Sequence, residues 1–123
     1  MALDYTSKID GDLLSVTTRG SDDSVDEAVA YGESIIRLCI ENQCNKVIVD
    51  ERELTGVLDK VMTYEMVQRL LSLVPYHLRI AYVINPDYVE DVSFGVLVAE
   101  NRGIHVKAFL SMEPAREWVM QRA

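Results

Sequence analysis

Residues Val47–Gly56, which read Val-Ile-Val-Asp-Glu-Arg-Glu-Leu-Thr-Gly, are the stretch that decides the fold. The stretch opens with three consecutive β-branched residues. Such a continuous apolar run is typical of a strand that is covered on both faces of a parallel sheet. We expect the charged segment Asp50–Gly56 that follows to be a loop. In parallel α/β domains, ligands and partners are met at the carboxyl ends of the strands, so this loop is the first candidate for a functional site.

The sequence on either side of this strand alternates between strand and helix patterns. Asp10-Gly11-Asp12 lies between two β-prone runs, and Asp-Gly in that position indicates a hairpin. Apolar residues then recur at helical spacing in four separate segments. The expected strands are Tyr5–Ile9, Leu13–Thr18, Lys46–Asp50, Leu78–Ile84 and Ile104–Leu110, and the expected helices are Val25–Asn42, Asp59 or Lys60 to Pro75, Pro86–Arg102 and Met112–Arg122.

Capping residues support these boundaries. Ser24 followed by Glu27 is a capping box, and Asp59 is a plausible N-cap of the second helix. Asn85-Pro86 favours another helix start, and Gly103 fits a left-handed C-cap. Gly32 lies on the apolar stripe of the first helix, where we expect it to let another backbone approach closely.

The resulting order is ββαβαβαβα. Strands that are separated by single helices imply right-handed parallel crossovers, and the opening hairpin adds one antiparallel pair. The predicted fold class is therefore α/β, with a four- to five-stranded, mixed but mostly parallel sheet, an N-terminal hairpin and four helices.

Length and charge exclude several classes of protein. A chain of 123 residues predicts a single domain over residues 1–123. The formal net charge of −8 disfavours a nucleic-acid partner, which would need a clustered basic face. The two cysteines, Cys39 and Cys44, lie too close in sequence to staple a fold, and we expect no signal peptide and no integral membrane segment. The expected location is cytoplasmic.

Three motifs resemble a known family. They are Val-Ile-Val-Asp-x-Arg-x-Leu-x-Gly at Val47–Gly56, Arg-Ile-Ala-Tyr-Val-Ile at Arg79–Ile84, and Asn-Arg-Gly-Ile-x-Val-x-x-Phe at Asn101–Phe109 followed by Glu117-Trp118. Together they are similar to SpoIIAA-like proteins of the STAS-like (sulphate transporter and anti-sigma factor antagonist) superfamily. The resemblance covers about Lys46 to Val119.

The resemblance implies a non-catalytic regulatory module. Anti-sigma antagonists of this kind bind a kinase partner through the loop and helix after the third strand, and phosphorylation of a serine in an Asp-Ser-Ser-Gly-like turn switches them. The matching segment here has no such serine. Thr55 and Thr63 are the hydroxyls nearby, and neither lies in the pattern. The phosphorylation switch therefore does not transfer to this chain.

The loop remains the candidate surface for a partner or ligand. Leu54, Val57, Leu58 and Met62 would form an apolar patch if they were exposed together, and such patches usually mark contact surfaces. The residues predicted for this binding loop are Asp50, Arg52, Leu54, Thr55, Gly56, Leu58 and Asp59.

The chain offers little for catalysis or metal binding. Asp50, Glu51 and Glu53 could form a carboxylate cluster, but we favour solvated glutamates, with Asp50 bound to loop amides and Arg52 as an ion-pair partner. The only histidines, His77 and His105, lack metal-ligand spacing. Cys39 fits a core position, and Cys44 lacks basic neighbours that would activate a thiol. We predict no enzyme activity, no metal and no cofactor.

An apolar pocket near the carboxyl end of the sheet is a second hypothesis. The candidate lining residues are Met62, Met66, Tyr82 and Tyr88, beside Tyr64 and Tyr76. Met and aromatic residues at helical spacing more often belong to a core. Relatives of the STAS-like group include Sec14-type lipid-binding domains, which also implies an apolar ligand, although this chain is short for a large lipid cavity.

Two functions follow as alternatives. The first is a protein-interaction or regulatory module that binds an unidentified protein or a second copy of itself as a homodimer, because the helix Pro86–Arg102 is apolar on most sides. The alternative is a small carrier or sensor of an apolar, lipid-like ligand.

Overall fold

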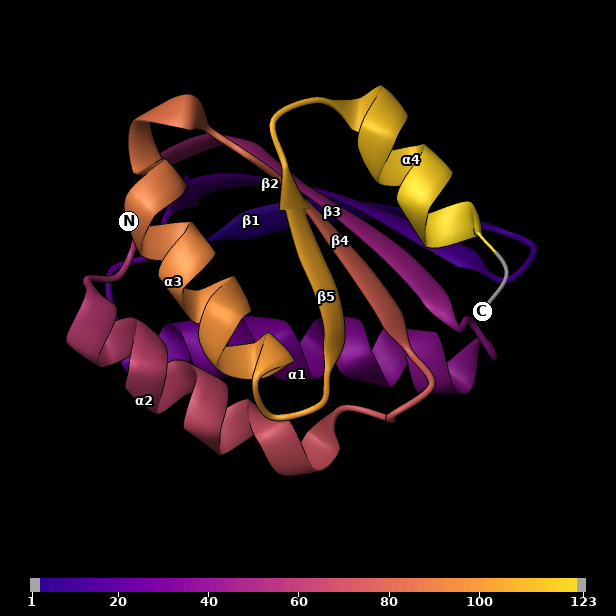
Figure 1. The fold of residues 1–123 in the computed structure, drawn as a ribbon, viewed down its shortest axis with the longest axis horizontal. Coiled ribbons are helices and arrows are strands. Elements are labelled where there is room, and N and C mark those ends of the chain that lie inside the picture. Colours follow the sequence, from indigo (N-terminus) through magenta and orange to yellow (C-terminus); the bar gives the residue numbers. More distant parts are fainter. Residues whose placement is uncertain (1–2, 122–123) are drawn as a thin grey trace.

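The computed structural model describes residues 3–121. Five strands and four α-helices follow one another in the predicted order, as Figure 1 shows. The strands are β1 (Asp4–Asp10), β2 (Leu13–Ser21), β3 (Lys46–Gly56), β4 (Arg79–Ile84) and β5 (His105–Phe109). The helices are α1 (Val25–Glu41), α2 (Lys60–Leu70), α3 (Val89–Glu100) and α4 (Met112–Met120).

The strands form one sheet in the order β1-β2-β3-β4-β5. The β1–β2 hairpin is antiparallel and the other three pairs are parallel. Consecutive strands thus lie side by side, which is the usual arrangement of strands joined by single crossover helices. The predicted α/β class, the mixed sheet and the order ββαβαβαβα are confirmed.

Strand β3 is longer than predicted. The expected strand ended at Asp50, but pairing with β2 continues to Gly56, where Ser21 lies opposite it. The expected loop Asp50–Gly56 is therefore the second half of a strand. The prediction was wrong because it was based on the polarity of the side chains. The end of β2 pairs with this segment through backbone hydrogen bonds, which charged residues can also make. The β2–β3 register shifts twice in this half, between Thr17 and Arg19 and between Gly20 and Ser21.

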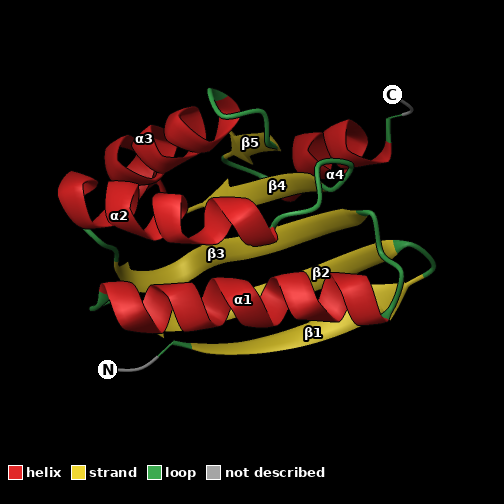
Figure 2. Ribbon diagram, turned by 90° about the horizontal axis from the view of Figure 1, so that it is seen from below, coloured by secondary structure: helices red, strands yellow, loops and turns green. Residues whose placement is uncertain are grey.

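The sheet is covered on both faces. Figure 2 shows α1, α2 and α3 side by side over one face, and α4 lies over the other. On the first face, Val47 and Val49 of β3 pack with Ile35 and Cys39 of α1. On the second face, Ile48 packs with Ala115 and Val119 of α4. This alternation along β3 explains its continuous apolar run.

The helix starts agree with the capping residues. Ser24 Oγ accepts a hydrogen bond from the Glu27 amide at 3.1 Å, and Asp59 accepts one from the Met62 amide at 2.9 Å. Asn85 accepts from the Asp87 amide and begins a 3-10 turn, Pro86–Tyr88, that leads into α3. Ser111 precedes α4 without a side-chain cap.

The helix ends differ from the predictions by a few residues. Helix α2 ends at Leu70 and continues as a 3-10 turn, Leu71–Leu73, before Pro75. Helix α3 ends at Glu100, and Gly103 adopts a positive φ of 89° three residues later. The expected end of the last helix, Arg122, lies outside the described residues.

Two glycines set how closely α2 lies to its neighbours. A Cβ on Gly32 of α1 would come within 2.6 Å of Leu70 Cδ1, and a Cβ on Gly95 of α3 would come within 2.7 Å of Thr63 Cγ2. Side chains of α2 therefore fill the space that both glycines leave. At Gly32 the close neighbour is the Leu70 side chain, and the expectation of a close backbone was wrong. No helix within residues 3–121 has the length and apolar character that a membrane span needs.

Candidate ligand-binding cavity

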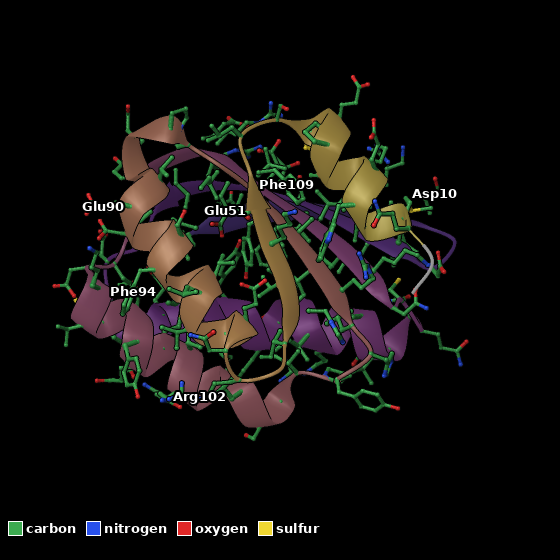
Figure 3. The ribbon with its side chains drawn as sticks, viewed as in Figure 1. Asp10, Glu51, Glu90, Phe94, Arg102 and Phe109 are labelled. Atoms are coloured by element: carbon green, nitrogen blue, oxygen red, sulfur yellow. The ribbon has the colours of Figure 1, made fainter. Side chains whose placement is uncertain are left out.

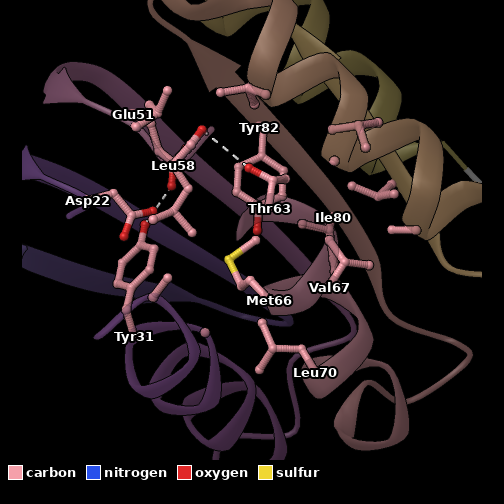
Figure 4. Close-up of a pocket in the computed structure, with 18 of the residues that line it drawn as sticks. Asp22, Tyr31, Glu51, Leu58, Thr63, Met66, Val67, Leu70, Ile80 and Tyr82 are labelled. Carbon is pink, nitrogen blue, oxygen red and sulfur yellow. Dashed lines mark hydrogen bonds between the residues drawn. The ribbon is translucent and has the colours of Figure 1, made fainter. Parts of the chain in front are cut away.

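A cavity of about 140 Å³ lies between the sheet and helices α1, α2 and α3. It extends from the carboxyl ends of β2 and β3 toward the amino ends of β4 and β5, as its lining residues Glu51, Ile80 and Val106 show. Figure 4 shows its acidic residues grouped at one end and apolar α2 side chains at the other.

Most of the cavity wall is apolar. Ile80 and Val106 form the floor on β4 and β5, while Met66, Val67 and Leu70 project from α2. Helix α3 adds further small and branched side chains. The remaining apolar lining residues are Ala28, Leu54, Val57, Leu58, Leu71, Val74, Val92, Val96, Ala99 and Ile104. A wall of this kind favours an apolar body over water.

Glu51 provides the main polar group of the cavity. Its side chain follows Val47 and Val49 on the same face of β3, and the residue is only 9% exposed. Figure 3 shows Glu51 in the middle of the molecule, whereas Glu90 and Arg102 lie at its periphery. Tyr31 Oη donates a hydrogen bond to Glu51 Oε2 at 2.9 Å. The buried Thr18 hydroxyl lies 2.7 Å from the same Tyr31 oxygen, so a chain of three side chains links β2, α1 and β3.

Asp22 lies beside this chain. It follows β2 directly, and its backbone N–H donates to the Gly56 carbonyl at 3.0 Å. Its Oδ1 atom is buried and has no hydrogen-bond partner among the described residues. A buried carboxylate oxygen without a donor is unfavourable, so this atom is a natural acceptor for an incoming group.

Burial changes the protonation of these residues. It raises the pKa of Glu51 from 4.5 to about 7, although the Tyr31 hydrogen bond acts in the opposite direction. It raises the pKa of Asp22 from 3.8 to about 6, and the negative charges of Glu27 and Asp23 add to that effect. Burial and the Glu51 charge also raise the pKa values of Tyr31 and Tyr82. Both carboxyl groups therefore titrate near neutral pH.

The predicted pocket residues fall into two groups. Met66 and Tyr82 line the cavity. Met62 and Tyr88 are outside its lining, and the Tyr88 hydroxyl instead donates to the Thr55 carbonyl at 2.7 Å. Tyr64 and Tyr76 are exposed.

The predicted binding-loop residues divide between the cavity lining and the exposed surface. Leu54 and Leu58 are buried and line the cavity, so the expected apolar patch is absent at these two positions. Arg52, Thr55 and Asp59 are exposed at the end of β3 and the start of α2, and Gly56 is partly buried.

Asp50 forms a bidentate ion pair with Arg52, with N–O distances of 2.9 and 2.8 Å. The predicted ion-pair role of Arg52 is therefore confirmed. Burial acts to raise the pKa of Asp50, but the hydrogen bonds from Arg52 outweigh it and lower that pKa.

The carboxylates Asp50, Glu51 and Glu53 do not converge. Glu53 is exposed and Asp50 pairs with Arg52, whereas Glu51 is buried, which corrects the expectation that it is solvated. Within residues 3–121 no group of three or more His, Cys, Asp and Glu side chains could hold a metal ion.

The cysteines are buried thiols. Burial raises the pKa of Cys39 from 9.0 to about 12 and also raises the pKa of Cys44. Neither thiol is activated as a nucleophile.

Sequence reasoning missed Glu51, Asp22 and Tyr31 as a group. The signal for Glu51 was present, because residues 47, 49 and 51 share one face of a strand. Tyr31 lies one residue before Gly32 on the first helix and outside its most regular apolar stripe. Asp22 belongs to a polar connection, and no local pattern predicts that such a residue turns inward.

No protein-family model and no curated protein matches the chain. Solved structures do match. An anti-sigma factor antagonist from Mycobacterium paratuberculosis superposes with a TM-score of 0.68 at 10% identity, over 98% of this chain and 96% of that one. An uncharacterized protein from Shewanella loihica with a SpoIIAA-like fold has a TM-score of 0.55 at 13% identity, with 96% and 94% covered.

The anti-sigma factor antagonist SpoIIAA in its unphosphorylated form gives a TM-score of 0.54 at 13% identity, over 97% of this chain and 100% of that one. Sequence identities this low establish a similarity of fold only. The three superpositions each cover nearly the whole chain, and they agree on one fold. The protein therefore has a SpoIIAA-like fold.

Proposed function

We propose that the protein is a non-catalytic regulatory module that binds another protein. The observation that supports this most strongly is the end-to-end similarity of the fold to anti-sigma factor antagonists. A fold does not determine a function by itself. The side chains at the β3–α2 end of the molecule add a second argument.

The surface that we assign to the partner consists of Arg52, Thr55, Asp59, Val61 and Tyr64, and we call it the β3–α2 surface. Val61 is 80% exposed and Tyr64 is 42% exposed on α2. Arg52, Thr55 and Asp59 are exposed at the strand end and the helix cap. Exposed apolar side chains with charged neighbours are typical of protein interfaces.

Tyr64 is held in place, as an interface anchor should be. Arg102 Nη2 donates to the Tyr64 hydroxyl at 3.2 Å, and the guanidinium carbon lies 5.6 Å from the ring centroid. A fixed aromatic side chain loses little conformational entropy when a partner binds, and Tyr is enriched among residues that dominate interface energies.

The test is capture of partners by the tagged protein, with Val61→Asp as the surface variant. Ile40→Asp is the matched control, because Ile40 is 57% exposed at the far end of α1. We expect a partner, or a second copy of the chain, that binds the wild type and Ile40→Asp but not Val61→Asp. Circular dichroism should show all three proteins folded. Equal binding by both variants would contradict the β3–α2 surface.

The cavity favours a second function, the binding of a small apolar ligand. Its volume of about 140 Å³ is too small for a lipid chain in an extended form but comparable to cavities, roughly 150 Å³, that bind a single aromatic ring. Native mass spectrometry of protein purified from cells tests this function. A bound molecule of low mass supports it, and failure to bind any single-ring probe in titrations would contradict it.

A further inference from the structure

The acidic end of the cavity indicates which ligand it takes, and this inference rests on the second proposed function. Asp22 and Glu51 both line the cavity. Glu51 is more than nine-tenths buried, and among residues 3–121 only one of its carboxylate oxygens, Oε2, accepts a hydrogen bond, from Tyr31. Asp22 contributes a buried oxygen without any donor. Acceptors therefore outnumber donors at this end.

Within the described part of the chain, no basic side chain forms an ion pair with Asp22 or Glu51. By contrast, the neighbouring Asp50 has Arg52 as its cation. A buried carboxylate normally has a positive partner or a set of donors, because its desolvation is costly otherwise.

The titratable groups that face the pair are all acidic. Glu27 and Tyr31 come from α1. Asp50 comes from β3, Tyr82 from β4 and Asp91 from α3, where it also lines the cavity. Helix α2 contributes Thr63 and apolar side chains to the cavity but no titratable group. The local potential is therefore negative.

We propose that the cavity binds a small molecule with a protonated amino group on an apolar body about the size of one six-membered ring. The ammonium group donates to the Asp22 and Glu51 carboxylates. The apolar body packs against Val67, Ile80 and Val106, which line the same cavity. Each part of the ligand thus meets the chemistry that it requires.

Other ligand classes satisfy the site less well. An anion would be repelled by both carboxylates. A neutral hydrocarbon would fill the apolar part but leave the Asp22 oxygen without a donor. An alcohol could supply one hydrogen bond but no charge, and hydrogen bonds to charged groups are the stronger ones.

The test uses four ring compounds of nearly equal size with the full chain: benzylamine, benzyl alcohol, toluene and benzoate. Chemical-shift titration at pH 8 gives their dissociation constants. We expect benzylamine to bind roughly ten- to hundredfold more tightly than benzyl alcohol, the difference that a charged hydrogen bond supplies. Its affinity should fall between pH 8 and pH 5, because protonation removes the charges of Asp22 and Glu51.

Glu51→Gln should weaken benzylamine binding by a similar roughly ten- to hundredfold factor and leave toluene binding unchanged. Glu53→Gln is the matched control, since Glu53 is exposed two residues along the same strand. Asp22→Asn is a second variant in case Glu51→Gln does not fold. Both carboxyl variants should weaken benzylamine binding and leave toluene binding unchanged.

The outcomes separate the two claims. Equal affinity for benzylamine and toluene, or full benzylamine affinity in the folded carboxyl variants, would overturn amine recognition while the cavity remains a binding site. Absence of binding by all four compounds would overturn both the amine proposal and the second proposed function.

Discussion

The two faces of the sheet differ in how completely their helices fill the space above the strands. On the α4 face, Ile48, Ala81, Val83, Ala115 and Val119 are each at most 1% exposed and belong to one cluster. On the α1–α3 face, three helices leave a cavity of about 140 Å³ with a buried glutamate. The α4 face is close-packed, as protein cores normally are. The α1–α3 face is packed less completely and contains a space that can hold a ligand.

Truncation of an isoleucine on each face is the strongest test of this difference. Ile48→Ala should lower the free energy of unfolding by about 4 kcal/mol, because Ile48 has neighbours on every side. Ile80→Ala should cost only about 2 kcal/mol, because Ile80 already borders the cavity. Urea denaturation of both variants gives the two values. Equal losses would mean that the faces are packed alike.

Titration of Glu51 should give the next largest effect. Its folded pKa of about 7 lies above the ordinary 4.5, so the folded state holds the proton more tightly and stability is lost as the pH rises through this window. The loss should amount to about 3 kcal/mol, on the scale of 1.36 kcal/mol per pKa unit. Denaturation curves from pH 4 to 8 should show it in the wild type, and Glu51→Gln should reduce that slope to the part that Asp22, with its pKa of about 6, contributes.

Asp50 provides the internal contrast for this experiment. Its pKa is lowered by Arg52, so its contribution is present above pH 3.8 and is lost as the pH falls. Asp50→Asn should therefore leave the slope between pH 5 and 8 intact. If Asp50→Asn removed that slope, Glu51 would not be its source.

Addition of one methylene to a valine should lower the free energy of unfolding on the α4 face and raise it on the α1–α3 face. Val83→Ile overfills the α4 face, where Val83 is fully buried, and should cost about 1–3 kcal/mol. Val106→Ile can extend into the cavity and should stabilise the protein by about 0.5–1 kcal/mol. Differential scanning calorimetry would show a lower and a higher melting temperature, respectively. A decrease for both variants would contradict a fillable space.

The glycines against α2 should give the smallest effects. In Gly95→Ala the new methyl meets Thr63 Cγ2, and Thr63 is buried with its hydroxyl bound to the Leu58 carbonyl, so we expect a loss of about 1–2 kcal/mol. In Gly32→Ala the methyl meets the flexible end of Leu70, which lines the cavity and can shift into it. The gain in helix propensity, about 1 kcal/mol, should then nearly cancel the cost. Urea denaturation distinguishes the two cases.

Local patterns predicted the fold better than the site. The hairpin at Asp10–Asp12, the caps at Ser24, Asp59 and Asn85 and the apolar run at Val47–Val49 act over a few residues, so one sequence contains their signal. The extension of β3 to Gly56 depends on pairing with the distant β2, which polarity does not reveal.

The site depends on contacts that are even less local. Tyr31 donates to Glu51 from 20 residues away, and it lies near Asp22 only because α1 folds back over β2 and β3. Leu54 and Leu58 flank exposed residues in the sequence but turn inward to line the cavity. Strand alternation could have assigned Glu51 to the buried face, and no comparable rule exists for Asp22.

The chain's single tryptophan lies on the α4 face, where the Arg79 guanidinium stacks 4.2 Å from its ring and donates to the Trp118 carbonyl at 2.8 Å. Tyr31 and Tyr82 lie on the opposite side of the sheet and line the cavity. Each layer therefore has its own optical reporter. Tryptophan emission follows the α4 layer during unfolding, whereas a molecule that enters the cavity changes the contribution of Tyr31 and Tyr82, two of the six tyrosines, to the near-ultraviolet signal. Occupancy and stability can thus be followed in one sample without an added label.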